Sequence, residues 1–156
     1  MPVFNVARGM VRYYAQIPDA NGGLFAALFK AASQSPDTTM ADFATLAAIK
    51  ASNTEADFTN YSRQPLTSVA SPGGTTIAPD MVNDILGIKC GDVTWLSAGG
   101  TTNNSLGRIV FYYNPNTTTS GNDASCVPLT FYQFATTTDG TNRVAQINQL
   151  GFWRSQ

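Results

Sequence analysis

The sequence of 156 residues contains no histidine and few charged residues, which make up 12% of the chain. Histidine most often transfers protons at neutral pH and is the commonest metal ligand. Its absence therefore excludes the usual Ser-His-Asp and Cys-His catalytic arrangements. Nine basic and ten acidic residues leave a net charge of −1. That balance argues against a nucleic-acid partner, because phosphate neutralisation needs clustered Lys and Arg.

Long apolar segments are also lacking. The longest is the run Leu24–Phe29, whereas a membrane-spanning helix needs about 20 apolar residues, so we expect no membrane partner. The first residues show neither the continuous apolar region nor the cleavage site of a secretory signal, which predicts a protein made in a cytoplasm. In that compartment Cys90 and Cys126 are expected to be buried, reduced thiols rather than a disulfide.

Neutral polar residues take the place of the missing charge. The chain has 19 Thr, 12 Asn and 11 Ser, against one Glu and three Lys. Apolar residues make up 43%, and a chain of this length can bury a substantial core. Neither a linker nor an internal repeat divides it. We therefore expect a single β-rich domain over residues 1–156, with Met1–Gly9 as an extended N-terminal arm lying on a neighbouring subunit.

Most of the sequence has the pattern of short strands separated by turns. Val11–Ile17 is aromatic-rich and ends in a turn cluster, and Leu24–Ala31 is expected to pair with it as an antiparallel hairpin. Pro65 predicts an edge position for its strand. Pro72-Gly73-Gly74 is expected to form a turn, and Ser97–Leu106 and Asn114–Asp123 polar loops. The further expected strands are Phe58–Leu66, Met81–Trp95 (split at Asn83-Asp84 and Gly91-Asp92), Arg108–Tyr113, Ala124–Phe134 and Val144–Trp153.

One segment has helical periodicity. Met40, Phe43, Ala47 and Lys50 recur at spacings of three and four residues, which predicts one amphipathic α-helix at about residues 39–51. Such a helix would pack as a lid across one face or end of a sheet. With seven or eight short strands, the expected fold is mainly β: an antiparallel β-sandwich, jelly-roll-like in its connectivity.

Carboxylates offer the remaining routes to chemistry. Glu55 and Asp57 are close enough in sequence to suggest a two-carboxylate hydrolase, and the region Asp80–Asp92 could be considered for calcium. Each of these residues, however, lies beside Asn, Gly or Pro in a turn context, and the regular spacing of a calcium loop is missing. We therefore expect no catalytic residues, no metal site and no cofactor.

Pairs of adjacent aromatic residues are the most suggestive feature. Neighbouring residues on a strand face opposite sides, so one ring of each pair should lie in the core and the other outside. An aromatic outer face with few charges favours a contact between subunits. The candidate subunit or capsid interface comprises Phe4, Arg8, Tyr13, Tyr14, Tyr112, Tyr113, Phe152 and Trp153.

Several stretches resemble a family of small virion proteins encoded in the structural modules of tailed bacteriophages. The most specific is Asn53–Arg63, whose counterparts read Thr-Glu-Ala-x-Phe-Thr-Asn-Tyr-x-Arg. Together the similar stretches run along most of the chain: Phe43–Ala48, Asn53–Arg63, Thr94–Leu106, Ile109–Pro115, Val127–Thr130, Phe134–Gly140 and Gly151–Arg154.

The resemblance implies a structural protein of the phage particle. Its best-fitting role is a capsid decoration (cement) protein, a homotrimer that binds between major capsid subunits on the exterior of the virion. It implies no catalytic residues. The close alternative is a tail-associated, head-fibre or receptor-binding protein on the particle exterior. A glycan-binding version would use Trp95 or Trp153 as a sugar platform, with Asn and Asp from the two polar loops.

Overall fold

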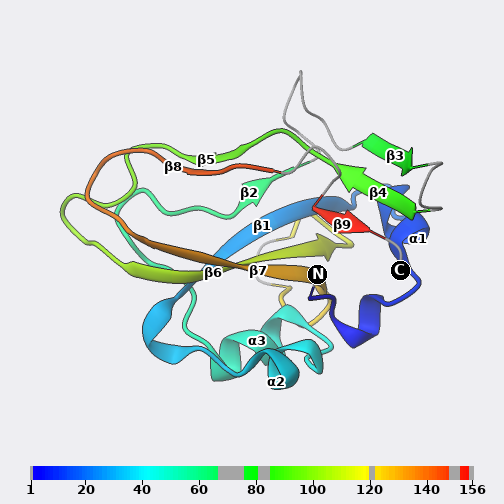
Figure 1. Cartoon of the computed structure of the whole chain (residues 1–156), viewed down its shortest axis with the longest axis horizontal. Helices are drawn as coiled ribbons and strands as arrows, with labels where there is room; N and C mark the ends of the chain where they lie inside the picture. Colours follow the sequence, from blue (N-terminus) through cyan, green and yellow to red (C-terminus); the bar gives the residue numbers. More distant parts are fainter. Residues whose placement is uncertain (1, 67–75, 81–84, 120–121, 148–151, 155–156) are drawn as a thin grey trace.

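The structure is a computed structural model that describes residues 2–66, 76–80, 85–119, 122–147 and 152–154. It consists mainly of strands in antiparallel sheets, with few and short helices (Figure 1). This agrees with the fold class expected from the short strands and frequent turns of the sequence.

The main sheet has the strand order β2-β1-β6-β7, with every pair antiparallel. The two inner strands are apolar almost without interruption, as is typical of strands that are covered on both faces. Pro65 lies in the edge strand β2, as predicted, because an edge position needs no N–H on the solvent side. The bounds are β1 (Gly23–Lys30), β2 (Gln64–Pro65), β6 (Ser105–Asn114) and β7 (Val127–Thr137).

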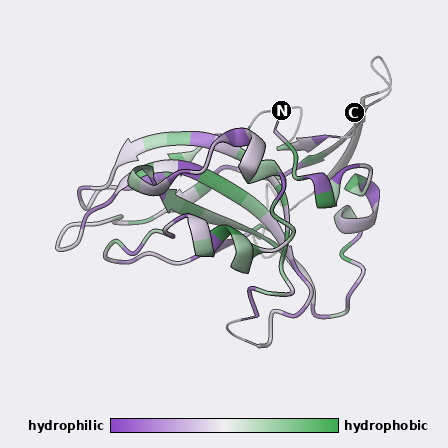
Figure 2. Cartoon of the chain, turned by 90° about the horizontal axis from the view of Figure 1, so that it is seen from below, coloured by the Kyte–Doolittle hydropathy of each residue, from purple (hydrophilic) through white to green (hydrophobic). Residues whose placement is uncertain are grey.

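Two short helices cover one face of the main sheet, α2 (Asp37–Ala41) and α3 (Leu46–Ser52). Met40, Leu46 and Ile49 are buried in one cluster with side chains of β1, β6 and β7. Figure 2, viewed from this side, shows the hydrophobic strands behind the helices. The prediction of a lid on the sheet is therefore confirmed.

The prediction of one continuous helix over residues 39–51 is wrong. Helix α2 ends at Ala41, and α3 begins after Thr45, whose backbone is extended. The Thr45 hydroxyl accepts a hydrogen bond from the Ala48 N–H at 3.1 Å, which satisfies a free donor at the start of α3. The turn between the helices lets Met40 and Leu46 both reach the sheet.

The opposite face of the main sheet is covered by short strands and the helix α1. The strands form a three-stranded sheet of order β3-β4-β9 and a two-stranded sheet of β5 and β8. Trp95 and Trp153 are buried on this side in one cluster with Ile109 and Phe111. The bounds are α1 (Val11–Ala15), β3 (Thr76–Asp80), β4 (Ile85–Lys89), β5 (Val93–Trp95), β8 (Arg143–Ala145) and β9 (Trp153–Arg154).

The expected hairpin between Val11–Ile17 and Leu24–Ala31 is wrong in its first half. Residues 11–15 form helix α1, and the second segment is strand β1, paired with β2 and β6. Tyr14 packs against Tyr113 and Trp153, with ring centroids 5.0 and 6.3 Å apart. Aromatic residues favour strands in general, but strand preference depends on context, and here this packing outweighs it.

The N-terminal segment does not extend away from the chain, contrary to the expectation for Met1–Gly9. Its described part packs along the outer edge of β7, where Phe4 N–H donates to Leu129 O at 3.1 Å and Phe131 N–H donates to Pro2 O at 3.4 Å. A 3-10 turn, η1 (Asn5–Ala7), follows. Phe4 is fully buried, with its ring centroid 5.1 Å from that of Phe131, and this burial holds the segment on its own subunit.

The remaining strand predictions differ mainly in their limits. Arg108–Tyr113 lies within β6, whereas β7 begins three residues later than the expected strand Ala124–Phe134 and extends to Thr137. The break at Gly91-Asp92 between β4 and β5 is confirmed. Strand structure in 58–66 is limited to β2, and 144–153 contains parts of β8 and β9. Pro72-Gly73-Gly74 and Asn83-Asp84 lie outside the described residues.

Candidate functional site

Five of the eight residues expected at an interface are buried inside the monomer. Their exposed fractions are 3% or less, which leaves almost no surface for a partner. These residues are Phe4, Tyr112, Tyr113, Phe152 and Trp153. The expectation that they form an aromatic contact surface is therefore wrong, because their rings fill the core of their own chain.

Tyr112 and Tyr113 show the physical reason. The two rings do point to opposite faces of β6, as strand alternation predicts. Tyr112 stacks on Phe25 on the helix side, at 5.7 Å between centroids, whereas Tyr113 lies on the other side and donates a hydrogen bond to Asp19 Oδ2 at 2.7 Å. Both faces are covered, so neither ring becomes an outer ring.

The accessible part of the expected interface lies on α1 and just after η1. Arg8 is exposed, Tyr13 is 50% exposed, and Tyr14 is half-buried. Val6, 41% exposed, and Arg12 lie on the same two elements. We call Val6, Arg8, Arg12 and Tyr13 the N-terminal patch. It combines two cations with two exposed apolar groups, and no carboxylate of the described residues forms a salt bridge with either arginine.

Three loops meet at the end of the molecule far from the N-terminal patch. These are residues 58–62, 96–104 and 138–142, named the loop tip, at the left of Figure 1. Backbone hydrogen bonds join all three: Gly99 N–H donates to Thr59 O at 3.0 Å, and Ala98 N–H donates to Thr141 O at 3.1 Å. Side chains add to them, since Asn60 Nδ2 donates to Ser97 O at 3.0 Å. The sequence predicted a polar loop here but not its union with two others.

Backbone conformation at the loop tip is unusual. Three glycines have positive φ angles, which residues with a Cβ rarely adopt. The values are 97° at Gly99, 102° at Gly100 and 93° at Gly140. Asn60 and Ser97 also have positive φ, 70° and 45°. Strained residues persist where surrounding contacts fix them, so the loop tip presents its side chains in one arrangement.

One large apolar side chain is exposed beside these polar groups. Leu96 is 66% exposed, the highest value among the large apolar side chains that the structure describes, and Val144 on β8 is 45% exposed. The neighbouring charges of Asp139 and Arg143 neutralise one another across 2.8 Å. The loop tip is therefore a neutral surface that combines hydroxyl and amide groups with one exposed apolar side chain.

A network of charged groups lies at the border of the helix-side core. Arg63 donates to Glu55 through Nε and Nη2, at 2.7 and 2.8 Å, and to Asp123 through Nη1 at 2.6 Å. Lys50 on α3 donates to Asp123 Oδ2 at 2.6 Å. Tyr61 donates its hydroxyl hydrogen to Glu55 Oε1 at 2.9 Å. We call these five residues the Arg63 network. It joins α3, the segment before β2 and the loop before β7.

The network keeps its carboxylates ionised. Burial alone would raise the pKa of Glu55, but hydrogen bonds from Arg63 and Tyr61 outweigh it, so this pKa lies below its usual range. Hydrogen bonds from Arg63 and Lys50 lower the pKa of Asp123 to about 2. A general acid needs the opposite shift. Sequence reasoning missed this network, although the single Glu of the chain and Arg63 both occur in the Asn53–Arg63 motif.

Asp57, the other carboxylate considered for catalysis, is a partner of Lys30 at 2.7 Å. A hydrogen bond from Lys30 and a second from Asn104 lower its pKa. Asn104 Nδ2 donates to Asp57 Oδ1 at 2.9 Å, and Asp57 N–H donates to Asn104 Oδ1 at 2.8 Å. This reciprocal pair fixes the loop that leads to β6, a structural use of the carboxylate.

Metal-ligating groups do not gather within the described part of the chain, where no cluster of three or more Cys, Asp or Glu could hold an ion. Asp92 from the region considered for calcium accepts a hydrogen bond from Ile147 N–H at 2.9 Å. Both cysteines are free, as expected: Cys126 is buried and Cys90 half-buried. Burial raises the thiol pKa to about 11 for Cys126 and about 12 for Cys90, so both are poor nucleophiles.

Trp95 and Trp153 do not offer a sugar platform. They are 1% and 0% exposed, and the Trp95 indole N–H donates to Ser62 O at 2.9 Å. A ring that stacks on a sugar must present one face to solvent, so these two side chains are core residues. The glycan-binding interpretation therefore loses its aromatic platform and retains only the polar loops.

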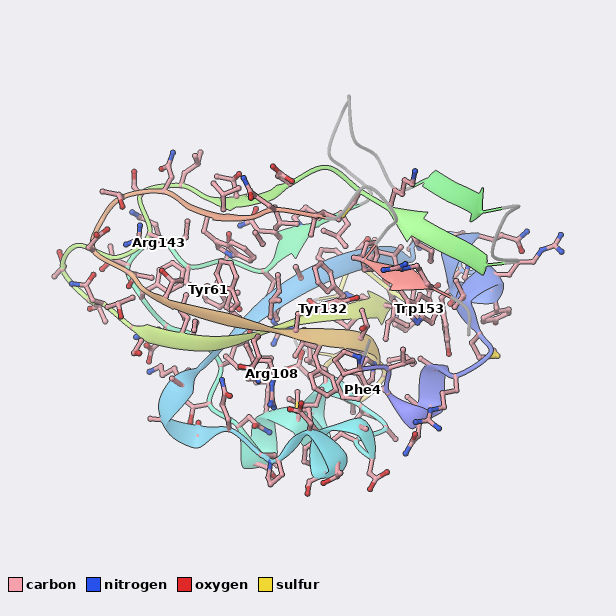
Figure 3. All side chains as sticks on the ribbon, in the orientation of Figure 1. Phe4, Tyr61, Arg108, Tyr132, Arg143 and Trp153 are labelled. Carbon is pink, nitrogen blue, oxygen red and sulfur yellow. The ribbon has the colours of Figure 1, made fainter. Side chains whose placement is uncertain are left out.

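A cavity of about 390 Å³, called the slot, opens on the side of the main sheet opposite the helices. Phe111, Tyr132, Phe134 and Phe152 provide its aromatic walls, with Gln133, Gln146 and Arg154 as polar lining residues. Figure 3 labels Tyr132 on β7 and Trp153 on β9, the strands that flank it. Sequence reasoning missed the slot, because its lining comes from β6, β7, β8 and β9, which are distant in the sequence.

No α-helix within the described residues is both long enough and apolar enough to cross a bilayer. No family model, curated protein or solved structure matches the chain significantly.

Proposed function

We propose that this protein is a structural component of a tailed-bacteriophage particle and acts as a decoration (cement) protein between major capsid subunits. The resemblance of Asn53–Arg63 to small virion proteins carries the proposal. In the fold, this motif supports the scaffold: Ala56 and Phe58 are buried, and Glu55 and Arg63 form the centre of the Arg63 network. The residues that resemble those of the virion proteins are therefore the ones that hold the fold together. This is expected for proteins that share an architecture but bind different partners.

A cement protein performs no reaction. It contributes contacts that exist only in the assembled lattice, so its binding free energy shifts the equilibrium toward that lattice. Many copies that each bind modestly restrain a shell, because their contacts act together. The ionised, hydrogen-bonded state of Glu55, Asp57 and Asp123 fits a role without acid–base chemistry.

Two surfaces suit this role. The loop tip is neutral and fixed in shape, and it includes the exposed Leu96, so it combines polar groups with one apolar contact residue. The N-terminal patch lies far from it along the molecule and is cationic. A particle lattice needs each decoration protein to contact more than one neighbour, and two separated surfaces meet that need. We propose a homotrimer on the virion exterior in which these surfaces contact the major capsid protein or the next copy.

We further infer that the fold is an antiparallel sandwich. The sheets of β4 with β9 and of β5 with β8 share one core with β1 and β6, through Ile88, Val93, Trp95 and Trp153. This supports two stacked layers. Jelly-roll connectivity stays a prediction.

The direct test is cryo-electron microscopy of purified particles of the phage whose genome encodes this chain. Density of the fold at inter-capsomer or quasi-threefold positions is the expected result, with the loop tip or the N-terminal patch in contact with capsid subunits. Density only at the tail or at a single vertex would contradict the cement role. Particles without the chain in any position would contradict a structural role altogether.

The alternative is a tail-associated or receptor-binding protein on the particle exterior, favoured by the rigid hydroxyl- and amide-rich loop tip. Isolated protein on a glycan array separates the two functions. Reproducible binding that is lost in Asn142→Ala, a change that removes the hydrogen bond from Ser97 N–H to Asn142 Oδ1, would favour attachment to a receptor. Equal signals for this variant and for Arg8→Ala in the N-terminal patch would argue against a glycan site at the loop tip.

A further inference from the structure

We propose that the slot binds a small amphipathic anion, with its apolar body between the aromatic walls and its anionic group beside Arg154. The occupant would be a free small molecule such as an aryl or alkyl carboxylate or sulfonate. This site is independent of the proposed role in the particle, and neither depends on the other.

The size and walls of the slot are those of a ligand site. Voids in well-packed protein cores seldom exceed a water molecule, whereas small-molecule sites typically measure about 300–1,000 Å³. The slot, at about 390 Å³, falls in the second class. Aromatic and aliphatic side chains form most of its lining, so an apolar group that enters from solvent would bury apolar surface there.

Contacts between its walls keep the slot open. The rings of Phe111 and Phe152 stack with centroids 4.6 Å apart, and Tyr132 lies edge-on to Phe111 at 6.2 Å. The Tyr132 hydroxyl donates a hydrogen bond to the backbone oxygen of Phe152, which joins β7 to the segment that leads into β9. The main sheet and its covering layer are therefore linked beside the cavity, and the walls need little rearrangement to receive a ligand.

The polar lining favours an anion. Among the described residues that line the slot, Arg154 is the only charged one, and none of them is a carboxylate. Five other cations form salt bridges with carboxylates at 2.5–2.8 Å, whereas Arg154 forms none with the described residues. A half-buried guanidinium beside an apolar cavity gives an incoming anion a charge-assisted, often bidentate partner.

Fluorescence titration of the full chain tests the proposal with two probes of similar shape. The first is 8-anilinonaphthalene-1-sulfonate, an anion, and the second is N-phenyl-1-naphthylamine, its uncharged analogue. The wild type should bind the anionic probe saturably, with one site per chain. Arg154→Gln should weaken the anionic probe about tenfold and leave the neutral probe within about twofold, because only the charge contact is lost. Arg8→Gln, the same change on the N-terminal patch, should affect neither probe.

A second variant fills the slot. Ala145→Leu adds side-chain volume to a buried lining residue and should weaken both probes, while near-ultraviolet circular dichroism reports whether the fold is kept. Methyl NMR signals of Ile109 and Ile147 in the wild type should shift with the anionic probe, which places it in the slot without any variant. Absence of saturable binding, or equal loss in Arg154→Gln and Arg8→Gln, would overturn the proposal. Shifts confined to methyl groups outside the slot would do the same.

Discussion

The two faces of the main sheet share the same strands but are packed very differently. On the helix side, Met40, Leu46 and Ile49 from α2 and α3 are fully buried over β1 and β6, and the Arg63 network closes the border. On the other side, short strands cover the sheet and leave the slot of about 390 Å³.

The difference follows from the geometry of the covering elements. A helix presents side chains three and four residues apart on one face, so even five to seven residues fill a broad area. Alternate residues of a strand point away from the sheet beneath, so the two residues of β9 and the three of β8 supply few inward side chains. The same main sheet thus has one closed face, suited to stability, and one with room for a ligand.

The largest difference in stability between variants on the two faces is expected for two phenylalanines of β7. Phe131 is 1% exposed within the helix-side cluster, and Phe131→Ala should lower the free energy of unfolding by about 3–5 kcal/mol. Phe134 is half-buried beside the slot, and Phe134→Ala should cost about half as much, because its cavity joins one already present. Urea unfolding followed by tryptophan fluorescence at pH 7 gives both values. Equal losses would show that the two faces are packed alike.

The second prediction concerns the ionic border of the helix side. Arg63→Met removes the positive charge that pairs with both Glu55 and Asp123. It should lower the free energy of unfolding by about 2–4 kcal/mol in the same assay. Lys30→Met is the control: it breaks a pair with Asp57, which is 65% exposed, and should cost clearly less stability than Arg63→Met because solvent screens the pair. If the two variants lose the same stability, the Arg63 network is only a set of surface ion pairs.

Acid should weaken the fold in part through the carboxylates of the Arg63 network. The pKa of Asp123 in the folded chain is about 2, below the ordinary value of about 3.9, so its contribution is present above about pH 4 and is lost as the pH falls toward 2. The pKa of Glu55 is also lowered, so its contribution changes in the same direction. Urea midpoints at pH 7, 4 and 2.5 should decline less steeply for Asp123→Asn than for the wild type. A parallel decline would assign acid sensitivity to other groups.

The smallest effect on stability is expected for a larger side chain placed in the slot. Ala145→Leu should change the free energy of unfolding by less than about 1 kcal/mol, since the added methyl groups enter an existing cavity. Ala27→Leu, on the closed face, should cost about 1–3 kcal/mol through overpacking. The matched pair differs only in which face receives the leucine, so a reversed order would contradict the comparison.

Local sequence patterns predicted the strands with the strongest signals. Most of β6 follows from its β-branched and aromatic residues, and Pro65 at an edge follows from its missing N–H. β1 is a strand as predicted, but its partners are β2 and β6 rather than the expected hairpin partner. Val11–Ala15 was misjudged because aromatic residues suit a strand, whereas the packing of Tyr14 on Tyr113 and Trp153 favours a helix there. The prediction that one ring of each aromatic pair lies on an outer face failed. Strand alternation shows that neighbouring side chains point to opposite faces of the sheet, but it does not show whether another element covers each face.

The sequence by itself determined the mainly β composition, the two free thiols, a polar loop over residues 97–104 (though not its end, since the expected loop ran on to Leu106 in β6) and the low charge of the chain. These depend on residue type and on neighbours a few positions away. Only the tertiary structure decided which rings are buried, how Glu55 and Arg63 meet Asp123, how three loops form the loop tip, and where the slot lies. Each of those features joins segments distant in the sequence. Their positions result from burial and hydrogen bonding summed over the whole chain, which no local pattern contains.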